Sequence, residues 1–186
     1  EFRRVLFRSS PSRKLMDLEE LKAITHQLSL DLKEIEETLA LPDGRATLQL
    51  TTLRDLNATI DLMFEELERL GRPELLEALC PYFGVVWPSA RALAIEVART
   101  APCSVLEMGC GLAIPSLLAA RRGFDVLATD FHPQVERFLD LNRPRNAAQT
   151  LRYRSWDWQR DALFAKSEGP FDWVLGSDLL YDKELP

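Results

Sequence analysis

Residues 105–111 read Val-Leu-Glu-Met-Gly-Cys-Gly, and they constrain the fold more than any other part of the chain. They predict a short buried strand followed by a tight turn, because glycine adopts turn conformations freely and lets a ligand approach the backbone closely. Residues 115–122 then have helix-forming composition, and Pro115 suits the first turn of a helix. A strand, a glycine turn and a helix in this order predict a nucleotide-binding cradle, with a purely structural turn as the alternative.

A carboxylate follows the next apolar run. Residues 126–129 end in Asp130, about 20 residues after Gly109, where nucleotide-binding folds place an acid against ribose hydroxyls. A carboxylate can accept hydrogen bonds from both hydroxyls of a ribose diol. The alternative is that Asp130 caps the helix that Pro133 opens.

Two classes of cofactor compete for such a cradle. A dinucleotide fingerprint requires Gly or Ala at the position that Ile114 occupies, so that helix and strand can pack closely. A pyrophosphate is also a poor neighbour for Glu107, whereas the sulfonium and ammonium groups of S-adenosylmethionine are compatible with nearby carboxylates. The residues therefore favour S-adenosylmethionine.

Composition narrows the class of protein. The 186 residues are 46% hydrophobic and 28% charged, which is typical of a soluble globular protein with enough material for a core. The net charge of -6 argues against a nucleic-acid-binding surface. No apolar run is long enough to cross a bilayer and no signal peptide is recognisable, so we expect no membrane association.

Cysteine and histidine usage predicts neither disulfides nor a metal site. Cys80, Cys103 and Cys110 show no Cys-x-x-Cys spacing, and an odd number without a framework suits a reducing, cytoplasmic setting. Cys110 fits the turn as a small residue, with a reactive thiol as the alternative. His26 and His132 have no ligand partners in sight, so we expect no metal.

The residues at both ends of the sequence indicate that the chain is a fragment of a longer protein. Residues 1–9 look like the translation of a sequencing-adapter oligonucleotide, so we interpret residues 1–15 as a non-native or disordered leader. A basic arm that binds nucleic acid or membrane is the alternative. The native start is then Met16 or a position upstream, and residues 182–186 follow directly on an apparent strand.

Residues 16–80 predict a mainly helical N-terminal region. A first helix is indicated by apolar side chains three or four residues apart, namely Leu18, Leu21, Ile24, Leu28, Leu32, Ile35 and Leu39. Residues 42–44 break that helix, and residues 47–52 form a short strand or an extended connector. Asp55 caps a second helix, and residues 73–79 form a third. The apolar stripes favour core packing over a coiled-coil partner.

Residues 81–186 alternate helices and strands. The predicted strands are residues 104–108, 125–129, 151–155 and 171–176, and the predicted helices are residues 89–100, 115–122, a segment opened by Pro133, and 158–166. Short apolar strands that are each followed by a helix predict an α/β fold with a parallel sheet. We expect a Rossmann-like three-layer sandwich, truncated after the fourth strand, which leaves that strand as an unprotected edge. Trp173, inside the fourth strand, is expected in the core.

Several motifs follow one another in this region. They are Gly-Val-Val-Trp-Pro-Ser-Ala at residues 84–90, the glycine-turn motif at residues 105–112, Ala-Thr-Asp at 128–130, Trp-Asp-Trp at 156–158, and the run at 171–181 that ends Asp-Leu-Leu-Tyr. Together they resemble the seven-β-strand methyltransferases, specifically methyltransferase family 16, whose members include DXXY-type protein-lysine methyltransferases. The resemblance spans about residues 82–181. Ala113 departs from it, because it stands where the motif has a third glycine.

The resemblance implies a role for each matching residue. Glu107, Gly109 and Gly111 would lie beneath the methionine half of S-adenosylmethionine, and Asp130 would bind the ribose. The remaining cofactor contacts would come from Asp157 to the adenine amino group, Trp158 beside the base, Trp87 as part of the enclosure, and Ser177. An aromatic plane suits a purine face, although a core position is the alternative for Trp158.

Asp178 and Tyr181 are the candidate catalytic residues, because ligands of open α/β sheets bind beyond the carboxyl ends of the strands. Methyl transfer requires in-line attack on the sulfonium methyl, so orientation and desolvation matter more than a strong base. Aromatic walls also lower the pKa of a lysine by disfavouring its charge. Asp178 would orient the amine, and Tyr181 would shape the pocket. The alternative is a capping aspartate followed by a packing tyrosine.

The expected function is methyl transfer from S-adenosylmethionine to a lysine of a protein substrate, in a cytoplasmic enzyme. An acidic chain suits a basic target segment. Two alternatives stay open, because fold alone does not separate them: another acceptor (a protein histidine, a protein N-terminus or a small amine), and a catalytically silent module that binds a partner through its N-terminal helices. The sequence predicts no oligomeric state.

Overall fold

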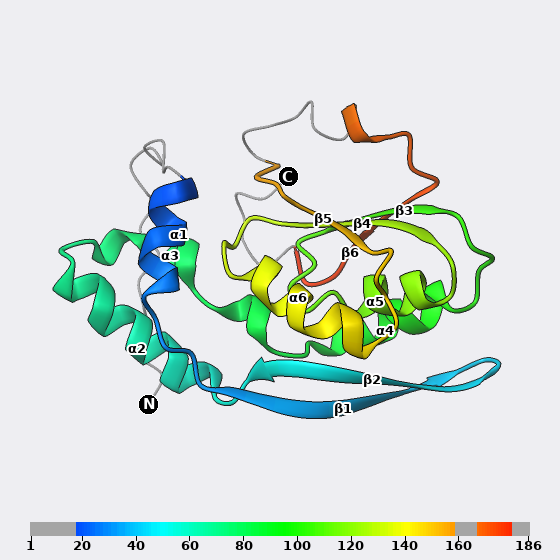
Figure 1. The fold of residues 1–186 in the computed structure, drawn as a ribbon, viewed down its shortest axis with the longest axis horizontal. Helices are drawn as coiled ribbons and strands as arrows, with labels where there is room; N and C mark the ends of the chain where they lie inside the picture. The colour runs from blue at the N-terminus through cyan, green and yellow to red at the C-terminus, as the bar shows by residue number, and fades with distance from the viewer. Residues whose placement is uncertain (1–17, 159–166, 180–186) are drawn as a thin grey trace.

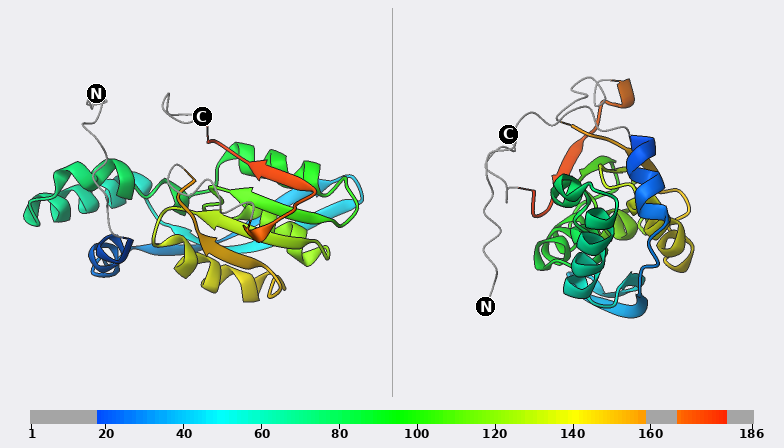
Figure 2. Two further views of the ribbon diagram at one scale, coloured as in Figure 1. Left: turned by 90° about the horizontal axis from the view of Figure 1, so that it is seen from above. Right: turned by 90° about the vertical axis from the view of Figure 1, so that its left-hand side faces the viewer.

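A four-stranded sheet forms the centre of the molecule. The structure is a computed structural model that describes residues 18–158 and 167–179. Helices cover one face of the sheet, and a two-stranded hairpin lies beyond those helices (Figure 1). A further group of helices lies at one end of the molecule, as the two rotated views also show (Figure 2).

The central sheet has the order β5-β4-β3-β6, and all its neighbouring strands are parallel. Its strands are β3 (Ser104–Met108), β4 (Asp125–Asp130), β5 (Arg152–Ser155) and β6 (Trp173–Gly176). All four predicted strands are therefore confirmed. β3 and β4 occupy the middle, in keeping with the nearly continuous apolar runs of doubly covered parallel strands.

Three helices pack on one face of this sheet: α4 (Pro88–Val97), α5 (Ile114–Arg121) and α6 (Val135–Arg145). The main core joins their apolar sides to β3 and β4; Leu117, for example, is fully buried with Val105 and Val126. Alternation along the strands sends Leu106 and Leu127 to the other face, where they form a smaller cluster with Trp156. Most of the predicted helix at residues 158–166 lies outside the described residues.

Trp173 is not a core residue, and that prediction is wrong. Its side chain is 39% exposed, and the neighbouring Val174 is 61% exposed. The reason is the place of β6 in the sheet: β6 is the outermost strand, with β3 as its described partner. Apolar composition predicts a strand, but it does not show which strand lies at the edge of the sheet.

Residues 32–41 form a strand, so the predicted continuation of the first helix through Leu39 is wrong. Helix α1 covers only Leu18–His26. β1 (Leu32–Leu41) pairs antiparallel with β2 (Gly44–Leu53), and Pro42 and Asp43 form the turn between them. The predicted strand at residues 47–52 is part of β2 and is confirmed.

A partly buried ion pair explains why the strand pattern of β1 is hard to recognise in the sequence. Ile35, Glu37 and Leu39 occupy successive inward positions, and an acid in the middle interrupts the apolar alternation. The Glu37 carboxylate is only partly exposed because it accepts two hydrogen bonds, of 2.7 and 2.8 Å, from the Arg91 guanidinium of α4. Without knowledge of that distant arginine, the apolar residues fit a helical spacing equally well.

Asn142 of α6 and Asn146, the C-cap residue of that helix, bind the edge of β2 that is not paired with β1. The side-chain amide of Asn142 pairs with the N–H and C=O of Thr51 at 2.7 and 3.2 Å, and that of Asn146 pairs with those of Gln49 at 2.9 and 2.8 Å. A helix repeats on one face every four residues and a strand every two, so the two pairs are in register. The backbone N–H and C=O groups on this edge of β2 therefore have hydrogen-bond partners, as buried backbone groups require.

Replacing Asn142 by alanine is expected to lower the free energy of unfolding by about 2 kcal/mol, because it leaves the buried N–H and C=O of Thr51 without partners. Chemical denaturation of this chain measures the change. Asn57→Ala, in the exposed first turn of α2, is the matched control and should change stability by less than about 0.5 kcal/mol. Equal effects of the two substitutions would contradict the edge-binding role.

The N-terminal helices form their own small core. They are α1, α2 (Leu56–Arg69), the 3-10 helix η1 (Pro73–Leu75) and α3 (Leu76–Leu79). Leu21, Met63, Leu67 and Leu79 are buried against one another. Asp55 caps α2 by accepting a hydrogen bond from the Ala58 N–H, as predicted.

In the described part of the chain, no single helix is both long enough and apolar enough to span a membrane. One bent pair, Pro73–Gly84 with Pro88–Val97, reaches that length and composition only when its two halves are taken together.

Candidate functional site

The sheet reverses its order at β3. The chain runs outward from β3 through β4 to β5 and then returns to add β6 on the other side of β3. In open α/β sheets, ligands bind beyond the carboxyl ends of the strands at such a reversal. The glycine turn follows β3, and Ser177 and Asp178 follow β6, so both segments lie at this position.

The glycine turn leaves no room for side chains. Gly109 and Gly111 have φ angles of +57° and +51°, a conformation that favours glycine. A Cβ on Gly109 would contact the Leu179 side chain and come within 3.3 Å of the Trp158 ring, and a Cβ on Gly111 would lie 3.1 Å from the carbonyl oxygen of Phe83. The backbone of the turn is therefore closely enclosed by other parts of the chain.

Ala113 keeps the same turn despite its side chain. Its φ of +54° lies in the left-handed region, where the family motif has glycine. Ala113 is also the N-cap residue of α5, and alanine has no side-chain acceptor for the first turn of a helix. Glu107 supplies that acceptor instead, because its Oε2 accepts hydrogen bonds from the N–H (3.1 Å) and hydroxyl of Ser116.

Glu107 is almost completely buried, with an exposed fraction of 1%. Its Oε1 has no hydrogen-bond partner among the described residues. Burial raises the pKa of Glu107 to about 7, although the two bonds from Ser116 act in the opposite direction. An unsatisfied buried carboxylate oxygen is costly unless a further donor or a positive charge approaches it.

Asp130 ends β4 and holds the glycine turn. Its Oδ2 accepts a hydrogen bond from the Gly111 N–H at 2.9 Å, and its Oδ1 accepts one from the His132 N–H at 2.8 Å. Burial raises the pKa of Asp130, and these backbone hydrogen bonds partly offset that effect. Each oxygen keeps a second lone pair for a hydroxyl donor. Asp130 therefore binds the backbone at Gly111 and at His132, and neither of these bonds caps the first turn of α6.

Trp158 and Asp157 follow β5, the strand beyond β4. The Trp158 ring packs edge-on against Trp156, with ring centroids 6.4 Å apart, and it lies over Gly109. Both Asp157 and Trp158 are half-buried. The structure therefore brings Trp158 to the glycine turn. Trp158 is not a pure core residue, because it is only half-buried where it packs against the cluster of Leu106, Leu127 and Trp156.

The start of α4 reaches the end of β6. Trp87 is the N-cap residue of α4 and is 38% exposed; its indole N–H donates to the Tyr82 carbonyl oxygen at 2.9 Å. Two residues later, the Ser89 hydroxyl donates a hydrogen bond to Oδ2 of Asp178. Asp178 has a φ of +54° and is exposed. Tyr181, the other predicted catalytic residue, lies outside the described residues.

Cys110 has little nucleophilic character. It is buried within the turn, and its N–H donates to the Thr129 carbonyl oxygen at 2.9 Å. Burial raises the pKa of the Cys110 thiol well above its usual range, so the thiolate is disfavoured. Among the residues that the structure describes, no group of three or more His, Cys, Asp or Glu side chains could hold a metal ion.

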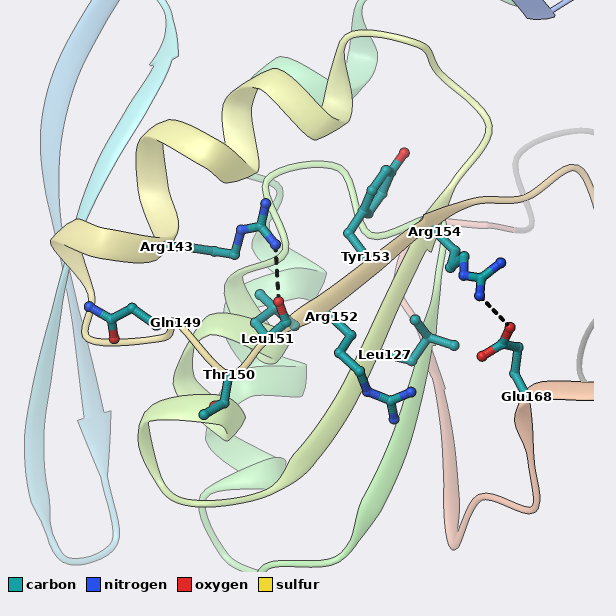
Figure 3. A pocket seen from close by; sticks show the side chains of 9 residues that line it. All are labelled: Leu127, Arg143, Gln149, Thr150, Leu151, Arg152, Tyr153, Arg154 and Glu168. Atoms are coloured by element: carbon teal, nitrogen blue, oxygen red, sulfur yellow. Dashed lines mark hydrogen bonds and ion pairs between the residues drawn. The ribbon is translucent and has the colours of Figure 1, made fainter.

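A pocket of about 370 Å³ lies elsewhere, at the outer side of β5 (Figure 3). None of the predicted site residues lines it. Its arginines are already engaged: Arg143 donates to the Leu151 carbonyl oxygen, Arg152 pairs with Asp125, and Arg154 pairs with Glu168. The carboxyl ends of the strands therefore remain the candidate site.

Comparison with known proteins identifies the family. Residues 79–185 match the lysine methyltransferase family. The chain belongs to that family. The helices α1 and α2 and the β1-β2 hairpin precede the matched segment.

The similar proteins include three curated methyltransferases, each 30% identical to this chain. They are the electron transfer flavoprotein beta subunit lysine methyltransferase of Xenopus laevis (121 residues, 61% of this chain and 46% of the relative), the protein-lysine methyltransferase METTL21E of Mus musculus (112 residues, 54% and 46%), and the histone-arginine methyltransferase METTL23 of Rattus norvegicus (125 residues, 60% and 55%). The chain spans about half the length of these relatives.

Sequence reasoning missed two serines of the site. Ser116 binds Glu107, and Ser89 binds Asp178. Ser116 occupies the third position of α5, where the backbone N–H needs an acceptor that the N-cap residue Ala113 cannot supply. The alanine at the N-cap therefore indicates that Ser116 binds an acceptor elsewhere in the chain. Ser89 carried no such signal, because its partner is distant in the sequence.

Proposed function

We propose that the full-length gene product transfers a methyl group from S-adenosylmethionine to a lysine of a protein substrate. One observation carries the proposal. The Gly111 N–H of the glycine turn binds Asp130, and Glu107 and Asp130 lie at the carboxyl ends of the adjacent parallel strands β3 and β4, within the segment that matches the lysine methyltransferase family. In that family S-adenosylmethionine supplies an electrophilic methyl group bound to a positively charged sulfur.

The residues at the turn fit such a cofactor. Glu107 offers a buried carboxylate oxygen that has no described partner, which suits the ammonium or sulfonium charge of the methionine half. Asp130 keeps lone pairs for two ribose hydroxyls. Trp158 offers an aromatic face for the adenine, and Asp157, Ser177 and Trp87 are proposed to complete the enclosure.

The acceptor lysine must lose its proton before its nitrogen can attack. In the proposed transfer the new nitrogen–carbon bond forms as the sulfur–carbon bond breaks, and the amine proton leaves to solvent. Asp178 is proposed to orient the amine as a hydrogen-bond acceptor, and Tyr181 is proposed to form an aromatic wall that favours the neutral amine. Positioning of this kind accounts for large rate effects without a strong base.

The similar proteins favour a protein acceptor without fixing the residue. Two of them are named for protein lysine and one for histone arginine. A transfer of radiolabelled methyl groups into lysate protein, followed by acid hydrolysis of the product, identifies the acceptor residue. Labelled methyl-lysine supports the proposal, and label in methyl-arginine or methyl-histidine replaces the proposed acceptor.

The proposed catalytic residues make a sharper prediction. Asp178→Ala and Tyr181→Ala are each expected to lower the rate of methyl transfer at least about tenfold, while S-adenosylhomocysteine affinity measured by calorimetry changes less than about threefold. Asp172→Ala is the matched control, because it removes an exposed aspartate from the opposite end of β6. Equal losses of rate and affinity in Asp178→Ala would make that residue structural.

A further inference from the structure

Ser89 and Asp178 are far apart in the sequence and are joined directly in the fold. The Ser89 hydroxyl, in the first turn of α4, donates a hydrogen bond to Oδ2 of Asp178, which follows the carboxyl end of β6. The bond connects α4, near the start of the matched segment, to the residues that follow β6, the last strand of the described chain. It is therefore a long-range contact at the candidate site.

Asp178 needs such a contact more than most exposed residues do. Its φ of +54° lies in the left-handed region, which is unfavourable for a residue with a side chain and persists when the surroundings hold it. The next residue, Leu179, packs its side chain over Gly109 and Gly176. One side of this short segment is thus held by apolar packing, and the carboxylate is held by Ser89.

Ser89 has no competing task in its own helix. Trp87 is the N-cap residue and Pro88 follows it, so Ser89 lies two positions after the N-cap and does not cap the helix with its hydroxyl. The same segment is fixed from its other side, because the Trp87 indole N–H binds the Tyr82 carbonyl oxygen and the two rings pack edge-on. Ser89 therefore projects from a backbone that is itself held in place.

We infer that Ser89 is a positioning residue, which sets the orientation of the Asp178 carboxylate toward the acceptor amine. The inference rests on the proposed catalytic role of Asp178. Ser89 acts through Asp178 and does not contact the reacting atoms. Loss of its hydroxyl leaves the carboxylate free to rotate, and misorientation of a catalytic group lowers the rate of the chemical step.

The test is a double-mutant cycle in the full-length gene product. Ser89→Ala is expected to lower kcat about tenfold with little change in the KM for S-adenosylmethionine, and Ser89→Thr, which keeps the hydroxyl, should restore most of the rate. In the Asp178→Ala background, Ser89→Ala should have no further effect, because residues that act as one unit are not additive. Equal effects of Ser89→Ala in both backgrounds would overturn the inference.

The chain offers a matched control for this cycle. Ser104 donates its hydroxyl to Oδ2 of Asp172 at 2.7 Å, which is the same kind of exposed serine–aspartate bond at the opposite end of β6. Ser104→Ala should leave kcat unchanged. A tenfold loss of rate in this variant as well would show that any loosening of β6 lowers activity, and it would remove the special role of Ser89.

A second measurement does not depend on activity. In Ser89→Ala, the backbone amides of Asp178 and Leu179 should exchange with deuterium about tenfold faster than in the unmodified protein, and Ser89→Thr should protect them. If the unmodified protein transfers no methyl group but this exchange difference is found, the proposed function fails and the positioning contact stands. If exchange is unchanged by Ser89→Ala, the positioning inference fails whatever the activity.

Discussion

Replacing Asp130 by alanine should weaken S-adenosylhomocysteine binding by at least about a hundredfold. The proposed ribose contact consists of two hydrogen bonds to a charged acceptor, each of which contributes about 1.5–3 kcal/mol. The substitution also removes the acceptor of the Gly111 N–H, so the turn beneath the cofactor loses a constraint. Calorimetric titration of the full-length gene product measures the loss.

Asp125→Ala is the matched control for Asp130→Ala. Asp125 begins the same strand, β4, and its exposed carboxylate pairs with Arg152 at 2.9 Å. An exposed pair of this kind contributes little to stability, so this variant should bind S-adenosylhomocysteine normally. Unchanged affinity in Asp130→Ala, with a normal thermal transition, would eliminate the proposed ribose contact.

Two buried groups should make large and opposite contributions to the pH dependence of stability. Burial raises the pKa of Glu107 from 4.5 to about 7, so folding is favoured by protonation, and this stabilisation is lost as the pH rises from 4.5 through 7. Burial lowers the pKa of His132 from 6.5 to about 4, so its stabilisation is present above pH 6.5 and is lost as the pH falls through 4. Each effect amounts to about 3 kcal/mol.

The two effects should nearly cancel in the unmodified chain and separate in single variants. Relative to the unmodified chain, Glu107→Gln should lose about 3 kcal/mol of unfolding free energy between pH 7 and pH 4, because the His132 effect is no longer offset by that of Glu107. His132→Gln should gain a similar amount over the same interval. Urea denaturation at each pH gives these differences. Exposed carboxylates such as Glu66 titrate in all three proteins and drop out of the comparison.

The two hydrogen bonds of His132 have opposite effects on its pKa. The bond from Nε2–H to the Leu79 carbonyl oxygen, at 3.1 Å, acts against the lowering by burial, while Nδ1 accepts from the Gln134 N–H at 3.2 Å, which disfavours protonation. Protonation at Nδ1 would place two N–H groups against each other. Parallel pH profiles of the unmodified chain and His132→Gln would contradict this account.

The central sheet could be predicted from the sequence because parallel strands buried on both faces are short apolar runs that end at recognisable turns. Val105 and Leu106 precede two glycines, and Val126 and Leu127 precede Asp130. The family resemblance assigned Glu107, the glycine turn and Asp130 to one cofactor, and that assignment stays a prediction. In the structure the Gly111 N–H of the turn donates a hydrogen bond to Asp130.

The remaining features depend on contacts between distant residues. In the sequence alone, Glu37 is indistinguishable from an outward-facing acid, because its partner Arg91 lies on another element. The sequence therefore predicts a helix where the structure has β1. Asn142 looks like an ordinary helical residue, yet it completes the edge of β2. Ser89 and Asp178 carry no sequence signal of their contact. Local propensity cannot encode any of these pairs, because each partner lies on another element.

The most direct test of the central claim is a pair of calorimetric titrations of the full-length gene product, one with S-adenosylhomocysteine and one with NAD. A turn without space for side chains, beside a buried acid with an unsatisfied oxygen, should bind S-adenosylhomocysteine at a single site and give no signal with NAD. Saturable binding of NAD without binding of S-adenosylhomocysteine, or no binding of either, would contradict the account.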